Sequence, residues 1–246
     1  MTTPDVTAAP VKPASVWEDC IDIFYAPTTV YERRRNGRWA LPLLIYTLLT
    51  AVMMFAARPM MAPMLEKQAA TQIEKMREGG MTGAQLENAS KVTRAMIDSP
   101  YALIPIVLFV PLGIFISALL LWIFSKLFGS TQSLGQSMTI ATFANFPRLV
   151  IGIISLGILY ATGSAGISSQ YSAGLSPASL LPDDTSVIVL AMLSRLELGV
   201  IWATILLGIG TYVIGRVSKQ SAALVALLVW LCATLFAVGS AFMQTS

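Results

Sequence analysis

Three ionisable side chains interrupt otherwise apolar stretches of the sequence, and they are the first candidates for chemistry. Arg148 follows Asn145 and Pro147 in one such stretch, while Arg195 and Glu197 interrupt a second. An ionisable group inside a membrane is costly unless it finds a partner or water. These charges therefore indicate either an ion pair between Arg148 and Glu197 that fixes helix packing, or a path or counter-charge for a transported ion or solute.

Other kinds of chemistry find little support in the residues present. The chain has no histidine, which excludes Ser-His-Asp and Cys-His catalysis, and its two cysteines, Cys20 and Cys232, lie far apart in the sequence. Zinc or haem ligation is therefore not expected. Asp183 and Asp184 are neighbours in a polar loop, and adjacency alone does not make a catalytic dyad. We expect no catalytic residue, no cofactor and no metal, and hence a protein that is not an enzyme.

The composition requires a lipid bilayer as the solvent. Of the 246 residues, 55% are hydrophobic and 12% are charged, whereas a soluble domain carries about 25% charged residues. The net charge of +3 is small, and no basic stripe is interleaved with aromatic residues, so nucleic acid is not an expected partner. Apolar runs close to the ~20 residues that cross a bilayer predict five transmembrane spans. They cover residues 39–57, 101–124, 138–161, 187–214 and 221–242.

The predicted fold is thus an all-α polytopic membrane bundle of five transmembrane helices, residues 39–242, with segments added to it. Residues 1–14 lack any periodic pattern and are expected to be a disordered tail before the lead at 15–38. Residues 58–100 form a polar insertion with scattered charges, in which Arg58 and Pro59 are expected to end the first span. Two glycines divide this insertion into a helical hairpin of two helices, about 60–78 and 82–97.

The lead carries the pattern of an amphipathic helix over residues 15–26. Trp17, Ile21 and Phe24 recur at helical spacing, and Ser15 with Glu18 matches a capping box. Such a segment beside a span is typical of an interfacial helix that lies on the membrane. A helix packed on the cytoplasmic ends of the spans explains the pattern equally well.

The third and fourth spans carry the remaining predictions. Arg148 and Glu197 each lie ten residues inside their span, so a rise of 1.5 Å per residue places both about 15 Å deep, near the bilayer midplane. Small residues spaced by four in the fourth span predict a face for close helix packing. That face consists of Gly199, Ala203, Thr204 and Gly208. The sequence shows neither paired discontinuous spans nor a clear inverted repeat of the kind found in transporters.

Basic residues close to the spans predict the orientation. In a five-span protein they fall on one side, which should be the cytoplasmic one. These residues are Arg33, Arg34, Arg35, Arg38, Lys126, Arg216 and Lys219. The opposite side receives the 162–186 loop, which has no Lys or Arg, and the 58–100 insertion, which contains six. The arginines before the first span dominate in such cases, so we expect a cytoplasmic N-terminus and an extracytoplasmic C-terminus.

Several short motifs resemble the Yip-domain family of membrane proteins, named for interaction with Ypt/Rab GTPases, and in particular its bacterial branch. They are IDIFYAP at 21–27, WALP at 39–42, SLGQS at 133–137, FANFP at 143–147, LEL at 196–198 and SKQSA at 218–222. The resemblance covers roughly residues 17–242 and implies five spans with a cytoplasmic N-terminus. Some bacterial members accompany ABC-type exporters. This chain departs from the family by its 58–100 insertion and by Arg148, so no GTPase interaction is carried over to it.

Two functions of different kinds follow. The first is a non-enzymatic scaffold or accessory protein of the bacterial cytoplasmic membrane, assisting an ABC-type exporter or organising the membrane. Its partners would be the lipid bilayer and a membrane protein, or further copies of the chain. The second is a small permease or ion-coupled transporter that uses Arg148, Arg195 and Glu197.

The orientation gives a first testable prediction. A reporter enzyme that is active only outside the cytoplasm should be active when fused after Ser246 and inactive when inserted near Gly129, because an odd number of spans separates the two sites. Reporter activity in intact cells is the measurement. The reverse pattern would overturn the orientation, and the same result at both sites would overturn the number of spans.

Overall fold

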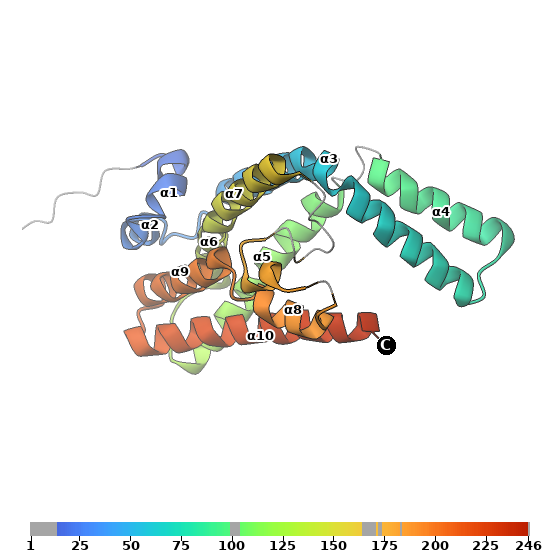
Figure 1. Ribbon diagram of the computed structural model, residues 1–246. Coiled ribbons are helices and arrows are strands. Elements are labelled where there is room, and N and C mark those ends of the chain that lie inside the picture. Colours follow the sequence, from blue (N-terminus) through green and yellow to red (C-terminus); the bar gives the residue numbers. More distant parts are fainter. Residues whose placement is uncertain (1–13, 99–103, 164–170, 172–173, 183, 246) are drawn as a thin grey trace, which may run out of the picture.

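The computed structural model describes residues 14–98, 104–163, 171, 174–182 and 184–245, and its elements are all helical (Figure 1). In chain order they are α1 (Val16–Asp22), α2 (Pro27–Arg33), α3 (Ala40–Glu78), α4 (Gly83–Asp98), α5 (Ile104–Leu127), α6 (Leu134–Ala144), α7 (Phe146–Thr162), the 3-10 turn η3 (Pro177–Leu180), α8 (Val187–Ser194), α9 (Leu198–Gly215) and α10 (Lys219–Thr245). The predicted tail lies outside the described residues except for Ala14, and Asp183 also lies outside them.

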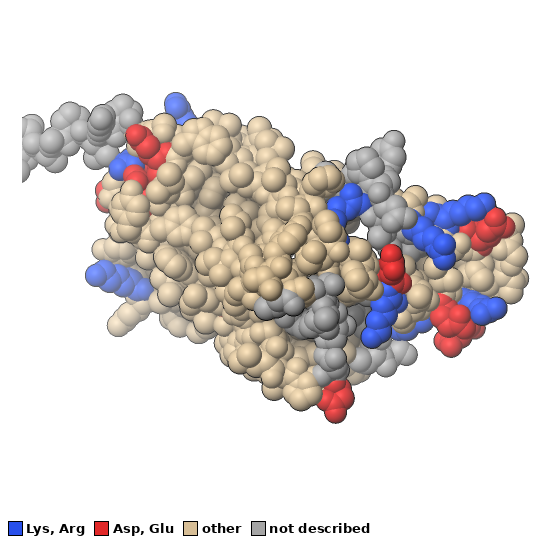
Figure 2. All heavy atoms as spheres, turned by 45° about the horizontal axis from the view of Figure 1, so that its top comes forward, with Lys and Arg blue, Asp and Glu red and all other residues tan. Residues whose placement is uncertain are grey.

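Five helical segments are long and apolar enough to cross a membrane, in agreement with the sequence prediction. They are Ala40–Glu78, Ile104–Leu127, Leu134–Ala161, Leu198–Gly215 and Lys219–Met243. Large apolar side chains such as Phe109 and Phe236 point away from the bundle and are exposed. On the face drawn in Figure 2, charged residues lie towards two ends, with a broad uncharged band between them. A bundle surrounded by lipid requires this distribution.

The first spanning helix is longer than the sequence predicted. Pro59 lies inside α3, which continues to Glu78, so the expectation that Arg58 and Pro59 end the helix is wrong. A proline removes one backbone donor, and spanning helices tolerate this loss where neighbouring helices support the turn. Here α7 packs alongside, and the Tyr160 hydroxyl donates a hydrogen bond of 2.6 Å to the Ala56 carbonyl.

The second half of α3 and all of α4 form a helical hairpin, which we call the arm (residues 64–98). The 39 residues of α3 extend about 58 Å at 1.5 Å per residue, roughly twice the hydrocarbon thickness of a bilayer. Gly79 caps α3, as predicted, and α4 begins at Gly83, one residue after the predicted start. In Figure 1 the arm projects away from the other helices, at the end opposite α1 and α2.

The third span is not one helix but two. The chain leaves the helix at Asn145, between α6 and α7, where a continuous helix was expected. Pro147 has no backbone N–H for the Phe143 carbonyl, and the Asn145 backbone N–H turns to the Thr142 carbonyl. The Asn145 side chain replaces its own backbone N–H at the Ala141 carbonyl, to which its Nδ2 donates at 2.8 Å.

The fourth span is also broken, and the expectation of one helix from 187 to 214 is wrong. Helix α8 ends at Ser194, and Glu197, with an extended backbone ψ of 138°, is the N-cap of α9. The Trp230 indole N–H from α10 donates to the Arg195 carbonyl at 3.2 Å. This contact supplies a partner for a carbonyl that the break removes from the helical ladder.

Helix α9 lies at the centre of the bundle, with α2, α6, α7 and α10 packed around it. At Gly210 the neighbours come so close that an added Cβ would lie 2.5 Å from Ile140 Cγ2 of α6 and 3.1 Å from Tyr31 Cζ of α2. Tyr31 is completely buried, and its hydroxyl lies 3.4 Å from the Ile140 carbonyl. Only glycine allows this approach of three helices.

The end of the bundle that carries Arg33–Arg38, Lys126, Arg216 and Lys219, which we call the basic end, is held by hydrogen bonds to the last turn of α9. Arg35 Nη2 donates to the Val213 carbonyl at 3.0 Å, and the Ser130 hydroxyl donates to the Gly215 carbonyl at 3.1 Å. The last carbonyls of a helix have no partner within it, so these side chains fill that role.

The packing at Gly210 gives a second prediction. Gly210→Ala should lower the melting temperature of the purified protein in detergent, because overpacking costs about 1–3 kcal/mol and outweighs the helix propensity of alanine. Gly157→Ala is the matched control, since nothing lies within 4 Å of an added Cβ on this helical glycine. Equal melting temperatures for the two variants would contradict the packing argument.

Candidate functional site

Asn145, Arg148, Arg195 and Glu197 line one cavity of about 480 Å³. Helices α3, α5, α7 and α10 supply the remaining walls. The three charged residues also line a neighbouring cavity of about 360 Å³, next to Tyr171. Residues that are 50 positions apart in the sequence thus meet at the two helix breaks, and we call this region the polar cavity.

The break between α6 and α7 positions Arg148. Its Nη1 donates to Asn145 Oδ1 at 3.3 Å, while its backbone N–H donates to the Asn145 carbonyl at 3.0 Å. Asn145 therefore both repairs the broken helix and orients the guanidinium. The side of Arg148 towards α9 is closely packed, because an added Cβ on Gly199 would lie 3.2 Å from the Arg148 Cα.

The break between α8 and α9 positions the other two charges. Arg195 is partly buried, and its Nε has no hydrogen-bond partner among the described residues. Glu197 is partly buried as the N-cap of α9, and one of its carboxylate oxygens would lie 3.7 Å from a Cβ added to Gly174. Both charges therefore stand at the cavity with hydrogen-bonding capacity that the described chain does not use.

The charges of the polar cavity do not cancel. In the described part of the chain, Glu197 forms no ion pair within 4.0 Å with Arg148 or Arg195, so the expected direct pair stays a prediction. Two guanidinium groups and one carboxylate leave one positive charge in excess, and the N-termini of α7 and α9 add partial positive charge. The arrangement suits water together with a small anion such as a carboxylate or phosphate.

The cavity lies towards the far end of the bundle. Arg148 is 14 residues from Leu134 and Glu197 is 18 residues from Gly215, which correspond to about 21 and 27 Å along helices that start at the basic end. Trp230, which contacts the Arg195 carbonyl, is 11 residues or about 17 Å into α10. In a core of about 30 Å, the Arg195 carbonyl thus lies near the middle, whereas Arg148 and Glu197 lie in the half away from the basic end and not at the midplane expected from the sequence.

The four small residues predicted to form one packing face contact different neighbours. Gly199 lies against Arg148 and Ile151 of α7, and Ala203 is buried. Gly208 instead faces α10, where an added Cβ would lie 3.6 Å from the Ala226 Cβ, and the partly exposed Thr204 hydroxyl donates to the Val200 carbonyl. Gly199 and Gly208 therefore face different neighbours, because nine residues at about 100° each turn the helix by about 180°.

The lead also divides its apolar residues between two surfaces. The capping box of Ser15 and Glu18 is present, and α1 ends at Asp22, earlier than predicted. Trp17 and Ile21 are 61% and 63% exposed, whereas the Phe24 ring packs edge-on against Trp202 of α9 at 5.7 Å between centroids. Phe24 therefore does not belong to the exposed stripe, and α1 both packs on the bundle and presents an apolar face.

Sequence reasoning missed the ion-pair cluster beneath α1. Asp19 is completely buried and pairs with both Arg33, at 2.8 Å, and Arg34, while Asp22 pairs with Arg33 at 2.7 Å. Burial raises the pKa of the neighbouring Cys20 thiol to about 12, so this cysteine is not a reactive nucleophile. The only signal in the sequence was two acids spaced to face two of the four arginines. Those arginines were used for orientation alone.

These features define the class of protein: a multi-pass helical membrane protein with a polar cavity between two broken spans. The chain belongs to the Yip1 domain family, whose model matches residues 21–241, nearly the whole chain. The resemblance seen in the sequence motifs is thereby confirmed at the level of the family. Comparisons with curated proteins and with solved structures gave no match.

The charge arrangement gives a third prediction. Glu197→Gln should destabilise the protein more in the wild-type background than in an Arg148→Met background, because a charge left alone in a membrane costs more than a neutral site. The melting temperatures of the four proteins in detergent should show a coupling of about 0.5 kcal/mol or more. Glu32→Gln with Arg148→Met is the control pair and should be additive, since Glu32 is exposed on α2. If the effects of Glu197→Gln and Arg148→Met also add, there is no ion pair between Glu197 and Arg148. The same cycle would then be measured with Arg195 in place of Arg148.

Proposed function

We propose that the protein is a non-enzymatic accessory protein of the bacterial cytoplasmic membrane, which holds a membrane-protein partner. The observation that carries this proposal is the arm. Helix α4 packs extensively against α3 alone, and the arm extends beyond the apolar part of α3. An ABC-type exporter is the partner class that the family resemblance suggests.

The surface of the arm supports a role in contact with another molecule. Its charges are of both signs, and pairs such as Glu87–Lys91, at 2.7 Å, are exposed. Val92 is 54% exposed on the same helix. Two helices bury little surface between them, so ordering a hairpin whose one extensive contact in the described chain is between its own two helices gains little stability for the bundle. A binding partner accounts for the arm better than stability does.

The lead supports the membrane placement of this accessory role. The exposed Trp17 and Ile21 face away from the bundle, and aromatic and aliphatic residues of this kind suit the headgroup region of a bilayer. With the N-terminus in the cytoplasm, α1 would lie on the inner leaflet and the arm would reach its partner outside.

The arm gives a fourth prediction. The full chain should co-purify from mild detergent with one integral membrane protein at fixed stoichiometry. Replacing residues 71–91 with a short Gly-Ser turn should reduce the recovered partner by about ten-fold or more, since it removes the contact surface. Quantitative mass spectrometry of the purified complexes is the measurement. Removal of residues 243–246 is the control, because it shortens α10 at the same end of the bundle without touching the arm.

The shortened protein must retain the melting temperature of the full chain, which shows that the membrane domain is intact. Full recovery of the partner by this variant would contradict the arm as the interface. Recovery of further copies of the chain alone would replace the accessory role by self-association.

The polar cavity favours a second candidate function, a small permease or ion-coupled transporter for an anion. The sequence showed no paired discontinuous spans, whereas the structure has two broken spans that meet at Arg148, Arg195 and Glu197. Transporters bind substrates at helix breaks of this kind, where half-helix N-termini face anionic groups.

The fifth prediction tests this function. Purified protein in liposomes should release acetate or phosphate down a gradient, and Arg148→Gln or Arg195→Gln should slow the release about ten-fold because each removes a counter-charge. Arg38→Gln, an exposed cation of the basic end, should leave the rate unchanged. A protein that melts normally and releases neither anion excludes the permease for these substrates.

A further inference from the structure

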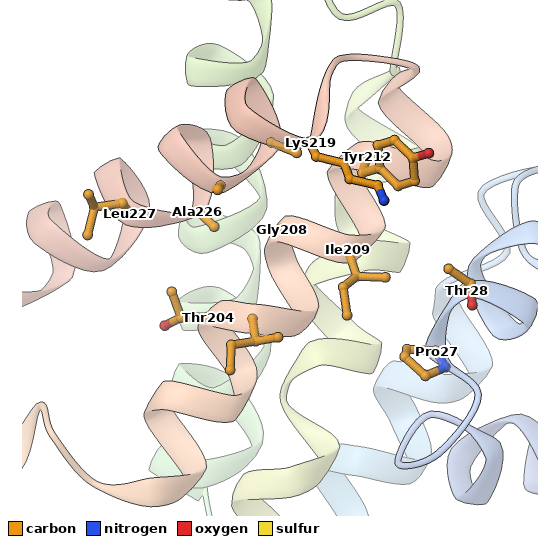
Figure 3. Close-up of a pocket in the computed structure, with 12 residues that line it drawn as sticks. Pro27, Thr28, Thr204, Gly208, Ile209, Tyr212, Lys219, Ala226 and Leu227 are labelled. Atoms are coloured by element: carbon orange, nitrogen blue, oxygen red, sulfur yellow. The ribbon is translucent and has the colours of Figure 1, made fainter.

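An apolar groove of about 650 Å³ runs between α9 and α10, on the side where α2 begins (Figure 3). Its floor consists of small residues, because Gly208 of α9 meets Ala226 of α10 there. Pro27 and Thr28 of α2 form a third wall. Ile205 and Leu227 line the groove and remain about half exposed, so the described chain does not fill it.

The length of the groove matches one leaflet of a bilayer. Its lining extends from Lys219 to Leu227 on α10 and from Tyr212 to Thr204 on α9, a separation of eight positions on each helix. Eight positions correspond to a rise of about 12 Å, whereas one leaflet contributes about 15 Å of hydrocarbon. A transmembrane helix of a partner needs a surface that crosses both leaflets, and this groove crosses one.

The charge of the lining is confined to one end. Lys219 is the one charged residue among those described around the groove, and it lies at the basic end, beside the α9–α10 turn. Its Nζ lies 5.7 Å from the centre of the Tyr212 ring, and Figure 3 shows both side chains at the same end of the groove. The walls below it are nearly all apolar. A cation at the membrane surface above an apolar slot is complementary to an anionic amphiphile.

We propose that this groove binds one acyl chain of an anionic phospholipid, with the headgroup phosphate against Lys219. The chain lies over Gly208 and between Ile205 and Leu227. The lipid belongs to the leaflet at the basic end, which is the cytoplasmic leaflet in the predicted orientation. The site involves neither the arm nor the polar cavity, so it is independent of the proposed functions.

The test measures lipid bound to the full chain. Native mass spectrometry in detergent, with dioleoyl phosphatidylglycerol or dioleoyl phosphatidylcholine added, should show one tightly bound phosphatidylglycerol per chain. Lys219→Gln should weaken the preference for phosphatidylglycerol about five-fold, since a basic residue near the headgroups contributes on that scale. Ala223→Phe, at an exposed position of the lining, should fill the groove and reduce binding of both lipids about ten-fold.

Matched controls lie next to each substitution. Leu224→Phe adds an aromatic ring one residue away, outside the groove lining, and Arg38→Gln removes an exposed cation at the same end; both should bind lipid as the wild type does. Unchanged melting temperatures without added lipid confirm that the variants are folded. Inorganic phosphate alone should not displace phosphatidylglycerol from the groove, because most of the contact there is apolar. Equal lipid binding by Ala223→Phe and Leu224→Phe would overturn the proposal. So would Lys219→Gln with an unchanged lipid preference, or a groove occupied by a second copy of the chain.

Discussion

The close approach of three helices at Gly210 is the contact on which the rest of the structure depends. The Ile140 side chain of α6 packs directly on Gly210 of α9, and the buried Tyr31 ring closes the contact from the side of α2. Because α9 packs against α2, α6, α7 and α10, its distance from α6 sets the geometry of the bundle. The same contact holds the N-terminal helices on the bundle and brings Arg35 within reach of the last turn of α9.

The two halves of the bundle differ in how closely their helices pack. Around Thr139, Ile140 and Phe143 the side chains are completely buried, as in the interior of a soluble protein. Beyond Asn145 and Arg195 the helices break, and space opens between them. A charge inside a membrane requires water or a partner, and a continuous helix offers neither. The breaks place backbone polar groups beside the three charges, so the groups that are costly in a membrane are collected at one cavity.

The number of spanning segments and the all-helical class could be predicted from the sequence, because apolar length alone decides what crosses a bilayer. The capping box at Ser15 and the turn at Gly79 were also predictable, since each follows from local chemistry. The break at Arg195–Glu197 was not, because it contains neither proline nor glycine and depends on Trp230, 35 residues away. At Pro59 the error was the opposite one: the sequence predicted the end of a helix, but α3 continues, since a neighbouring helix supports the turn that contains Pro59. The grouping of the four polar residues depends on both breaks and so required the structure.

One helix, α3, carries both a wall of the polar cavity and the arm. Tyr46, Thr50 and Met53 line the cavity, and the same helix continues for 25 residues, or about 38 Å, to Glu78. One continuous helix therefore joins a wall of the cavity to the arm. Met53 lies against Gly152 of α7, where an added Cβ would be 2.6 Å from its sulfur, so α3 and α7 are in close contact beside the cavity. A partner bound to the arm would therefore be connected to the walls around Arg148 through a single helix.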